Sequence, residues 1–137
     1  MGLYIRFRQQ NFNAMYVADF VRTLMRHLRG HVVLLWDGAK IHKGPYIEEL
    51  KRSFRRLHVE QFPGYAPELN PTENVWGDFK SHDANSLPLT KRDILGKLHA
   101  NKRRVSRSQA KLRSFVLASH LPSPPWLPAY HYLRDAQ

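Results

Sequence analysis

The stretch Val32-Val33-Leu34-Leu35-Trp36-Asp37-Gly38 is the most informative part of the sequence. Its first five residues are all apolar and begin with two β-branched valines, which favours a strand. A continuous apolar run is typical of a strand in a parallel sheet that is buried on both faces. The run stops at a common turn pair, so Asp37 is predicted to stand at the carboxyl end of a buried strand.

The segments before this strand predict a strand and a helix. Residues 3–7 alternate apolar side chains with Arg and predict a short strand. Apolar residues at helical spacing follow, after a cap at Asn11 or Asn13 and before a stop at Gly30.

The segments after it continue the alternation. Pro45 is placed to open a second helix, and residues 58–62 predict another short strand. Asn70 and Thr90 are predicted to cap two further helical regions, the second of which breaks near residues 106–108. The order predicts an α/β layered domain with a largely parallel sheet.

The charge of the chain points to a polyanionic partner. The 137 residues carry a net charge of +11 and include no cysteine, which excludes disulfides and thiolate zinc sites and fits a reducing cytoplasm. Nine Lys or Arg and one acid lie in residues 91–113, which favours binding to nucleic-acid phosphates over a merely solvated helical face. The candidate contacts to the DNA backbone are Lys102, Arg103, Arg104 and Arg107.

The chain has no segment that predicts membrane insertion or export. Its longest unbroken apolar run is Val32 to Trp36, far short of the roughly 20 residues of a membrane span. The N-terminus has no long apolar stretch after its first charge, so no signal peptide is expected.

Two acidic residues could carry chemistry, although each has a purely structural interpretation. Asp37 follows a predicted strand, where ligands bind in open α/β sheets, but Asp-Gly is also a common turn pair. Glu73 lies three residues after the predicted cap Asn70, where a glutamate can reach back to the cap backbone. Taken singly, each residue favours the structural interpretation.

Together the two acids form part of a longer pattern. Its elements are Asp37 with His42 five residues later, then Pro63-x-Tyr65-x-Pro67, then Leu69-Asn70-Pro71-x-Glu73-Asn74-x-Trp76. Residues 38–72, 35 positions, separate the two acids. The pattern resembles the DDE transposases of the mariner-like bacterial insertion-sequence superfamily, whose third-carboxylate region reads Pro-Pro-Tyr-Ser-Pro-x-Leu-Asn-Pro-x-Glu-x-x-Trp.

The resemblance implies a ribonuclease-H-like fold that is N-terminally incomplete. Residues 1–120 would be a partial catalytic domain that lacks its first two strands, with residues 3–7 as the third strand and residues 121–137 as a Pro-rich tail. The chain departs from the family at Gly38, where Asn is usual, and at Gly64, where a second Pro is usual. The first catalytic Asp is absent, so the strand ending at Asp37 would have an exposed edge that invites a second copy or a partner chain.

The resemblance also implies a reaction and its participants. Such enzymes cut a phosphodiester and join the freed 3′-hydroxyl to target DNA, with two Mg²⁺ (or Mn²⁺) ions. Asp37 and Glu73 would be catalytic carboxylates and metal ligands, supported by His42, Asn70 and Asn74, with Lys43 as a further DNA contact. For His42, a contact near the scissile phosphate and a structural hydrogen bond to the turn are both open.

With two of three carboxylates the chain is expected to be inactive alone. Its partners would be double-stranded DNA, at element ends and target, and its place the bacterial cytoplasm, at the nucleoid. The alternatives are a non-catalytic basic DNA-binding module, a decayed transposase remnant, and an unrelated basic α/β protein.

Overall fold

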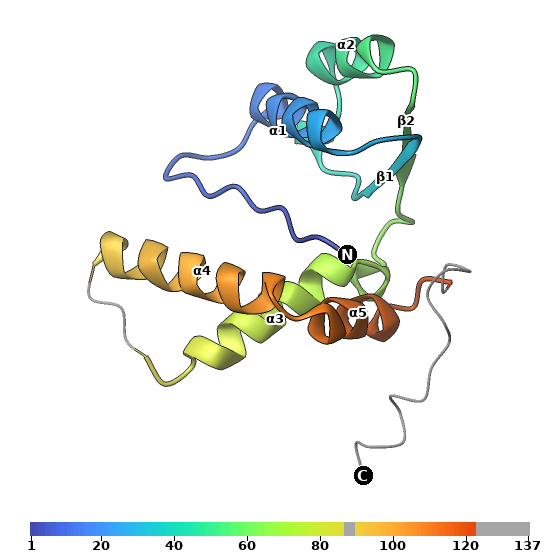
Figure 1. Ribbon diagram of the computed structural model, residues 1–137. Helices are drawn as coiled ribbons and strands as arrows, with labels where there is room; N and C mark the ends of the chain where they lie inside the picture. Colours follow the sequence, from blue (N-terminus) through green and yellow to red (C-terminus); the bar gives the residue numbers. More distant parts are fainter. Residues whose placement is uncertain (87–89, 123–137) are drawn as a thin grey trace. The chain divides into compact units, whose positions relative to one another are not determined.

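A computed structural model of the chain describes residues 1–86 and 90–122 (Figure 1). The chain divides into two compact units. We call Tyr4–Ala66 the α/β unit, and Met1–Leu3 together with the chain from Pro67 onward the helical unit. The predicted tail lies, from residue 123 on, outside the described residues, and the predicted domain limits at residues 120 and 121 stay a prediction.

The α/β unit contains a parallel pair of strands, as the sequence predicts. The strands pair in register from Val32 with Leu57 to Trp36 with Gln61, and a helix connects them, as a parallel pair requires. The elements in chain order are α1 (Ala14–His27), β1 (Val32–Trp36), the 3₁₀ turn η1 (Lys40–His42), α2 (Pro45–Ser53) and β2 (Leu57–Gln61).

The two helices of this unit begin at the predicted signals. Asn13 caps α1 by accepting a hydrogen bond from the Tyr16 N–H, which resolves the choice between the two candidate caps. Pro45 stands at the start of α2 after Gly44, whose φ of 100° suits glycine. Gly30 lies beyond the end of α1 at φ 73°, also in the left-handed region.

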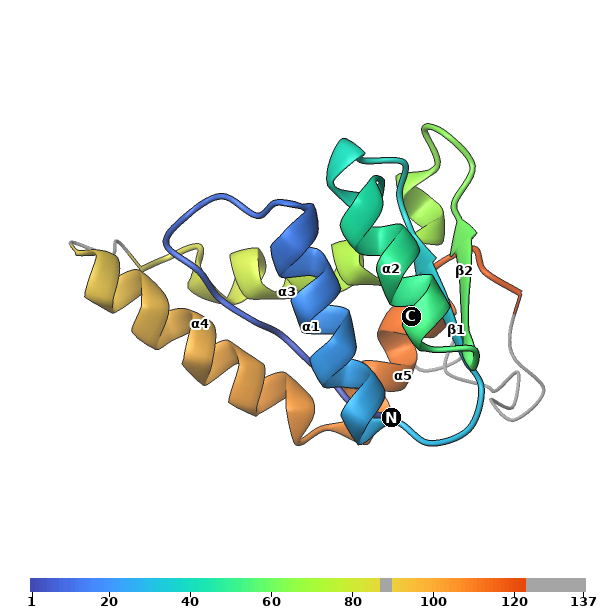
Figure 2. The ribbon, with the colours of Figure 1, turned by 90° about the horizontal axis from the view of Figure 1, so that it is seen from above.

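The core of the α/β unit lies on one face of the sheet. Its buried residues come from both helices and from β2, and apolar residues of both strands pack against them. Figure 2 shows α1 and α2 on the same side of the two strands. The prediction that β1 is buried on both faces is therefore wrong: Val33 is 62% exposed and Leu35 is 42% exposed. The physical reason is that α1 and α2 both pack on the face of Val32 and Leu34, so β1 has one covered face.

The predicted strand at residues 3–7 is also wrong. No strand is assigned there, and the sheet in the described part of the chain consists of β1 and β2. The segment is held to α1 by side chains instead: Arg6 forms an ion pair with Asp19 at 2.6 Å and lies 5.7 Å from the Phe20 ring centroid. Alternation gives a segment two faces, but a strand also needs a neighbour for its backbone hydrogen bonds.

The helical unit follows the predicted caps closely. Asn70 caps α3, and Thr90 with Asp93 forms a complete capping box at α4. The predicted break is present, because α4 ends at Ser106 and the Ser108 side chain caps the next helix. The elements are the 3₁₀ turn η2 (Pro67–Leu69), α3 (Pro71–Asp83), α4 (Lys91–Ser106) and α5 (Gln109–Ala118).

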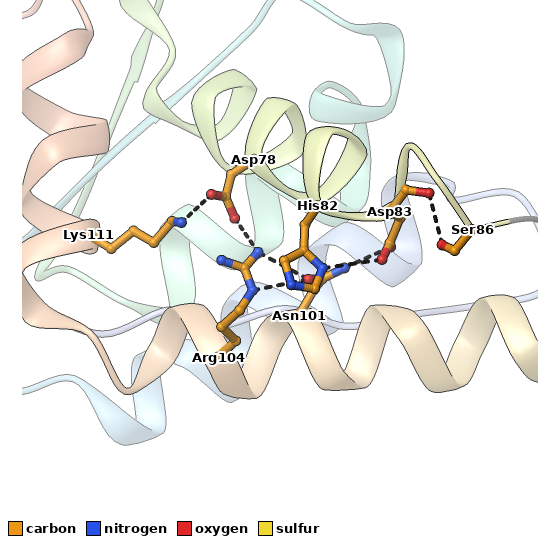
Figure 3. Close-up of polar contacts among 7 residues, drawn as sticks. All are labelled: Asp78, His82, Asp83, Ser86, Asn101, Arg104 and Lys111. Atoms are coloured by element: carbon orange, nitrogen blue, oxygen red, sulfur yellow. Dashed lines mark hydrogen bonds and ion pairs between the residues drawn. The ribbon is translucent and has the colours of Figure 1, made fainter.

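A partly buried acid ties the three helices of this unit together (Figure 3). The Asp78 carboxylate of α3 is 15% exposed and accepts from Arg104 of α4 and from Lys111 of α5. Burial alone raises the pKa of Asp78, but the hydrogen bonds and charges of Arg104 and Lys111 outweigh it and hold this pKa below its ordinary value. A second link joins α4 to α3, since the Asn101 side chain donates to Asp83 at 2.8 Å.

None of the helices in the described residues has the length and apolar character needed to cross a membrane.

Candidate functional site

Asp37 stands where the sequence predicts, directly after β1 at the carboxyl end of the parallel pair. The Phe62 N–H donates to the Trp36 carbonyl at 2.8 Å, so the chain leaving β2 is still bound to the last residue of β1. The segments that follow the two strands therefore leave the sheet at one edge. Ligands of open α/β sheets bind at this edge.

The two oxygens of the Asp37 carboxylate differ in their surroundings. Oδ1 accepts the Ala39 N–H at 2.9 Å and lies 2.9 Å from Nδ1 of His42. Oδ2 makes no hydrogen bond with any residue described in the α/β unit. The side chain is 63% exposed, so one oxygen is fixed by the loop and the other is available to a ligand.

His42 is held in place by the segment that it follows. Its ring stacks on Trp36 with centroids 4.6 Å apart and an interplanar angle of 4°, and its side chain is 17% exposed. Nδ1 also lies 3.1 Å from the Asp37 carbonyl oxygen. Both neighbours of Nδ1 are acceptors, so this nitrogen carries the hydrogen. Of the two interpretations open from sequence, the geometry favours the hydrogen bond to the turn.

Gln61 is a residue of this edge that the sequence analysis missed. It is the last residue of β2 and the register partner of Trp36. A Cβ built on Gly38 would lie 2.7 Å from its Nε2, so the carboxamide lies directly against the residue that follows Asp37. One sequence signal was present: Leu57 and Val59 alternate as apolar residues, and the next position on the same face is an amide.

Glu73 lies in the first turn of α3, after a rigid start. The Asn70 side chain accepts the Thr72 N–H at 3.0 Å, and Pro71 takes the first helical position. The Glu73 side chain does not reach back to the cap, which is the structural role open to it from sequence. It is exposed, and no hydrogen bond or ion pair joins it to the described residues of the helical unit.

Three other residues of the motif differ in their surroundings. The Asn74 side chain donates to the Phe115 carbonyl at 2.9 Å and so joins α3 to α5. Tyr65, in the loop after β2, has a φ of 57° and a fully exposed side chain, so its ring does not anchor the loop. Trp76 is partly buried and packs edge-on against Phe79 with ring centroids 5.5 Å apart.

The carboxylates suit a hard divalent cation by their chemistry. Asp37 and Glu73 each present oxygen that no residue described in its own unit occupies, and Mg²⁺ prefers such ligands. Across the described residues, no group of three or more His, Asp or Glu side chains is gathered to hold a metal ion. Asp37 belongs to the α/β unit and Glu73 to the helical unit.

The family model described as DDE superfamily endonuclease matches residues 3–95. The chain belongs to this family. The match covers both candidate carboxylates and the whole motif that joins them, and it ends within α4. Comparison with curated proteins and with solved structures gave no match.

Membership of the DDE endonuclease family supports a transposase-type nuclease domain that acts on DNA, in a family that generally uses divalent metals. The two-stranded parallel sheet and its helices are consistent with such a domain.

The basic residues of this DDE-family chain differ in their surroundings. Arg103 and Arg107 are exposed on the last turn of α4 and its cap, and Lys43 is exposed after η1. Arg104 and Lys111 instead point to Asp78 (Figure 3). The ion pair gives Arg104 an internal role, which competes with the DNA contact predicted for it.

Proposed function

We propose that this chain forms part of the catalytic domain of a mariner-like insertion-sequence transposase with a ribonuclease-H-like fold. Asp37 and Glu73 are its catalytic carboxylates and hold Mg²⁺ or Mn²⁺, and the DNA of element ends and target is its substrate. The observation that carries the proposal is the Asp37 carboxylate at the strand end, with one oxygen fixed and the other open. Family membership supports the reaction class.

Divalent ions bound by such carboxylates stabilise charge on the attacking and leaving oxygens of a phosphodiester. Neighbouring residues of the chain orient the two carboxylates in distinct ways. His42 and the Ala39 N–H fix the orientation of Asp37, since both hold its Oδ1. Asn70 and Pro71 fix the start of α3, and Asn74 ties that helix to α5, so Glu73 is presented from a rigid turn.

We propose that the chain alone binds the ions weakly and loses most of its catalysis, so that only slow residual cleavage at high concentration remains. A two-ion site of the family uses three carboxylates, and the positions of this chain that match the motif supply two of them. The exposed side chains of Val33 and Leu35 support association through the uncovered face of β1, because exposed apolar surface favours packing against another chain.

Cleavage of a supercoiled plasmid tests the proposed reaction. The wild-type chain at high concentration is expected to nick the plasmid slowly in Mn²⁺ and not in chelator. Glu73→Gln is expected to abolish this nicking without loss of folding, because the Glu73 side chain makes no contact that holds α3. Metal-dependent nicking that survives in Glu73→Gln would show that the site lies elsewhere.

The basic face of α4 supports DNA binding, and a matched pair of variants tests it. Arg103→Gln is expected to reduce the slope of log affinity against log salt by about one, because one phosphate contact is lost. Arg104→Gln removes the same charge one residue away but breaks the ion pair with Asp78. It is expected to lower stability and leave the slope unchanged, as measured by fluorescence anisotropy with labelled duplex DNA. Equal slopes for wild type and Arg103→Gln would contradict this assignment.

A non-catalytic DNA-binding module is the second candidate, and the same basic face favours it. In that case DNA affinity depends on salt but not on the divalent cation. Binding in Ca²⁺, which occupies carboxylate sites and generally supports little cleavage, compared with binding in chelator, separates the two candidates.

A further inference from the structure

The carboxyl end of β2 carries an amide where the pattern of the strand predicts an apolar residue. Leu57 and Val59 pack into the core of the α/β unit, and Gln61 is the next residue on that face. Gln61 is paired in register with Trp36, so only one peptide separates it from the level of Asp37. The amide therefore stands at the sheet edge where the candidate carboxylate stands.

The absence of a side chain at Gly38 leaves space for this amide. A Cβ on residue 38 would lie 2.7 Å from Nε2 and 3.6 Å from Cδ of Gln61, closer than real Cβ atoms approach other groups in the first case. The backbone does not itself require glycine there, because the left-handed glycines of the described chain are Gly30 and Gly44. Gly64, in the loop after β2, has nothing within 4 Å of an added Cβ. The absence of a side chain at Gly38 thus serves the approach of Gln61.

We propose that Gln61 is a further substrate-binding residue of this site and that its carboxamide donates an N–H to a non-bridging oxygen of a DNA phosphodiester beside Asp37. This inference rests on the proposed function, because it assumes that DNA enters at the Asp37 edge. Gly38 acts as a positioning residue, since it leaves the space that the carboxamide occupies.

The chemistry of an amide suits this position. Gln61 is exposed, and its carboxamide makes no hydrogen bond with the residues described in the α/β unit, so both donors are available. A lysine there would pair with Asp37 and compete with any cation for the carboxylate. A neutral donor can bind a phosphate oxygen and leave the charge of Asp37 intact. A carboxamide thus adds substrate affinity without weakening a cation site.

Three substitutions test the role of Gln61 through DNA affinity in Ca²⁺, which does not depend on turnover. Gln61→Ala is expected to weaken binding of a short duplex about tenfold, as the loss of one hydrogen bond to a charged group does. Gln61→Glu is expected to weaken it further, because a carboxylate repels the phosphate. Gly38→Ala is expected to match Gln61→Ala, because the added methyl displaces the carboxamide.

A double variant and a matched control make the test specific. Adding Gly38→Ala to Gln61→Ala is expected to cause no further loss, because no carboxamide remains to be displaced. Gly64→Ala adds the same methyl to a nearby loop with open space and is expected to bind like wild type. Amide spectra of each variant establish whether it is folded. If Gly38→Ala is unfolded, Gln61→Ala and Gln61→Glu still test the inference.

The side-chain NH₂ signals of Gln61, identified by their loss in Gln61→Ala, give an independent readout. They are expected to shift on addition of duplex DNA in Ca²⁺. The inference is overturned if DNA binding depends on Ca²⁺ and on Asp37 while Gln61→Ala and Gln61→Glu bind like wild type. It is also overturned if the effects of Gly38→Ala and Gln61→Ala add. Failure of the wild-type chain to bind DNA in a cation-dependent manner overturns the proposed function itself, and this inference with it.

Discussion

Asp78→Asn is expected to lower the free energy of unfolding of the helical unit by about 2–3 kcal/mol at neutral pH. The substitution keeps the shape of the side chain but leaves Arg104 and Lys111 without their shared anion. Both cations are about one third exposed, so water compensates for part of the loss, and the effect stays below that of a fully buried pair. Urea unfolding and hydrogen exchange of the α3–α5 amides measure the change.

The loss of stability in Asp78→Asn is expected to depend on pH. The folded-state pKa of Asp78 lies below its ordinary value, which is about 3.9 in an unfolded chain. Its stabilisation is therefore fully present above that value and is lost as the pH falls through the folded-state pKa. The difference between wild type and Asp78→Asn is expected to be constant near neutral pH and to shrink under acid conditions.

Asp83→Asn is the matched control for this prediction. Asp83 lies on the same helix and accepts from the neutral amide of Asn101, so an asparagine can accept in its place. Its effect at neutral pH is expected to be small, within about 0.5 kcal/mol. An equal loss in Asp83→Asn and Asp78→Asn would show that the ion pairs with Arg104 and Lys111 do not account for the stability of the unit.

Asp37→Asn is expected to weaken Mn²⁺ binding by about 100-fold and to leave the fold intact. The asparagine oxygen can still accept from the Ala39 N–H and from His42, so the turn after β1 is preserved while the charge is lost. Calorimetry and Mn²⁺-induced broadening of the Ala39 amide signal measure the binding. Unchanged affinity in Asp37→Asn would remove Asp37 from the site.

Glu73→Gln and the double variant then test whether the two carboxylates hold one site in common. If they do, each single variant and the double variant lose binding to a similar extent, because one site is destroyed in each case. If the two acids bind cations separately, Asp37→Asn leaves broadening of the Thr72 amide unchanged and the losses are independent. The second outcome would contradict the proposed catalytic pair.

Caps and turns of this fold could be predicted from sequence because they depend on neighbours in the chain. Asn13, Asn70 and the Thr90–Asp93 box each satisfy N–H groups within three residues of the cap. The strand predicted at residues 3–7 depends on a distant backbone edge, which alternation cannot reveal. The exposure of Val33 could likewise not be predicted, because it depends on the face of the sheet on which both helices pack.

The residues of the candidate site could also be predicted where they depend on nearby residues and not where they depend on distant ones. The position of Asp37 at a strand end followed from one apolar run and one turn signal. The bond from His42 lies within the same turn, and sequence left it as one of two alternatives. Gln61 was missed because its contact joins the end of β2 to Gly38 in the loop after β1, which is distant in the sequence. Arg104 was grouped with the DNA contacts because its partner Asp78 lies on another helix.

The exposed apolar residues of β1 and the exposed arginines of α4 are expected to respond to salt in opposite ways. Val33 and Leu35 expose apolar surface, and sulfate strengthens the association of such surface by its exclusion from it. The same ions are expected to weaken the phosphate contacts proposed for Arg103 and Arg107. Light scattering is thus expected to rise with ammonium sulfate while DNA binding falls. Low salt is then expected to favour both a dispersed protein and the proposed binding to DNA.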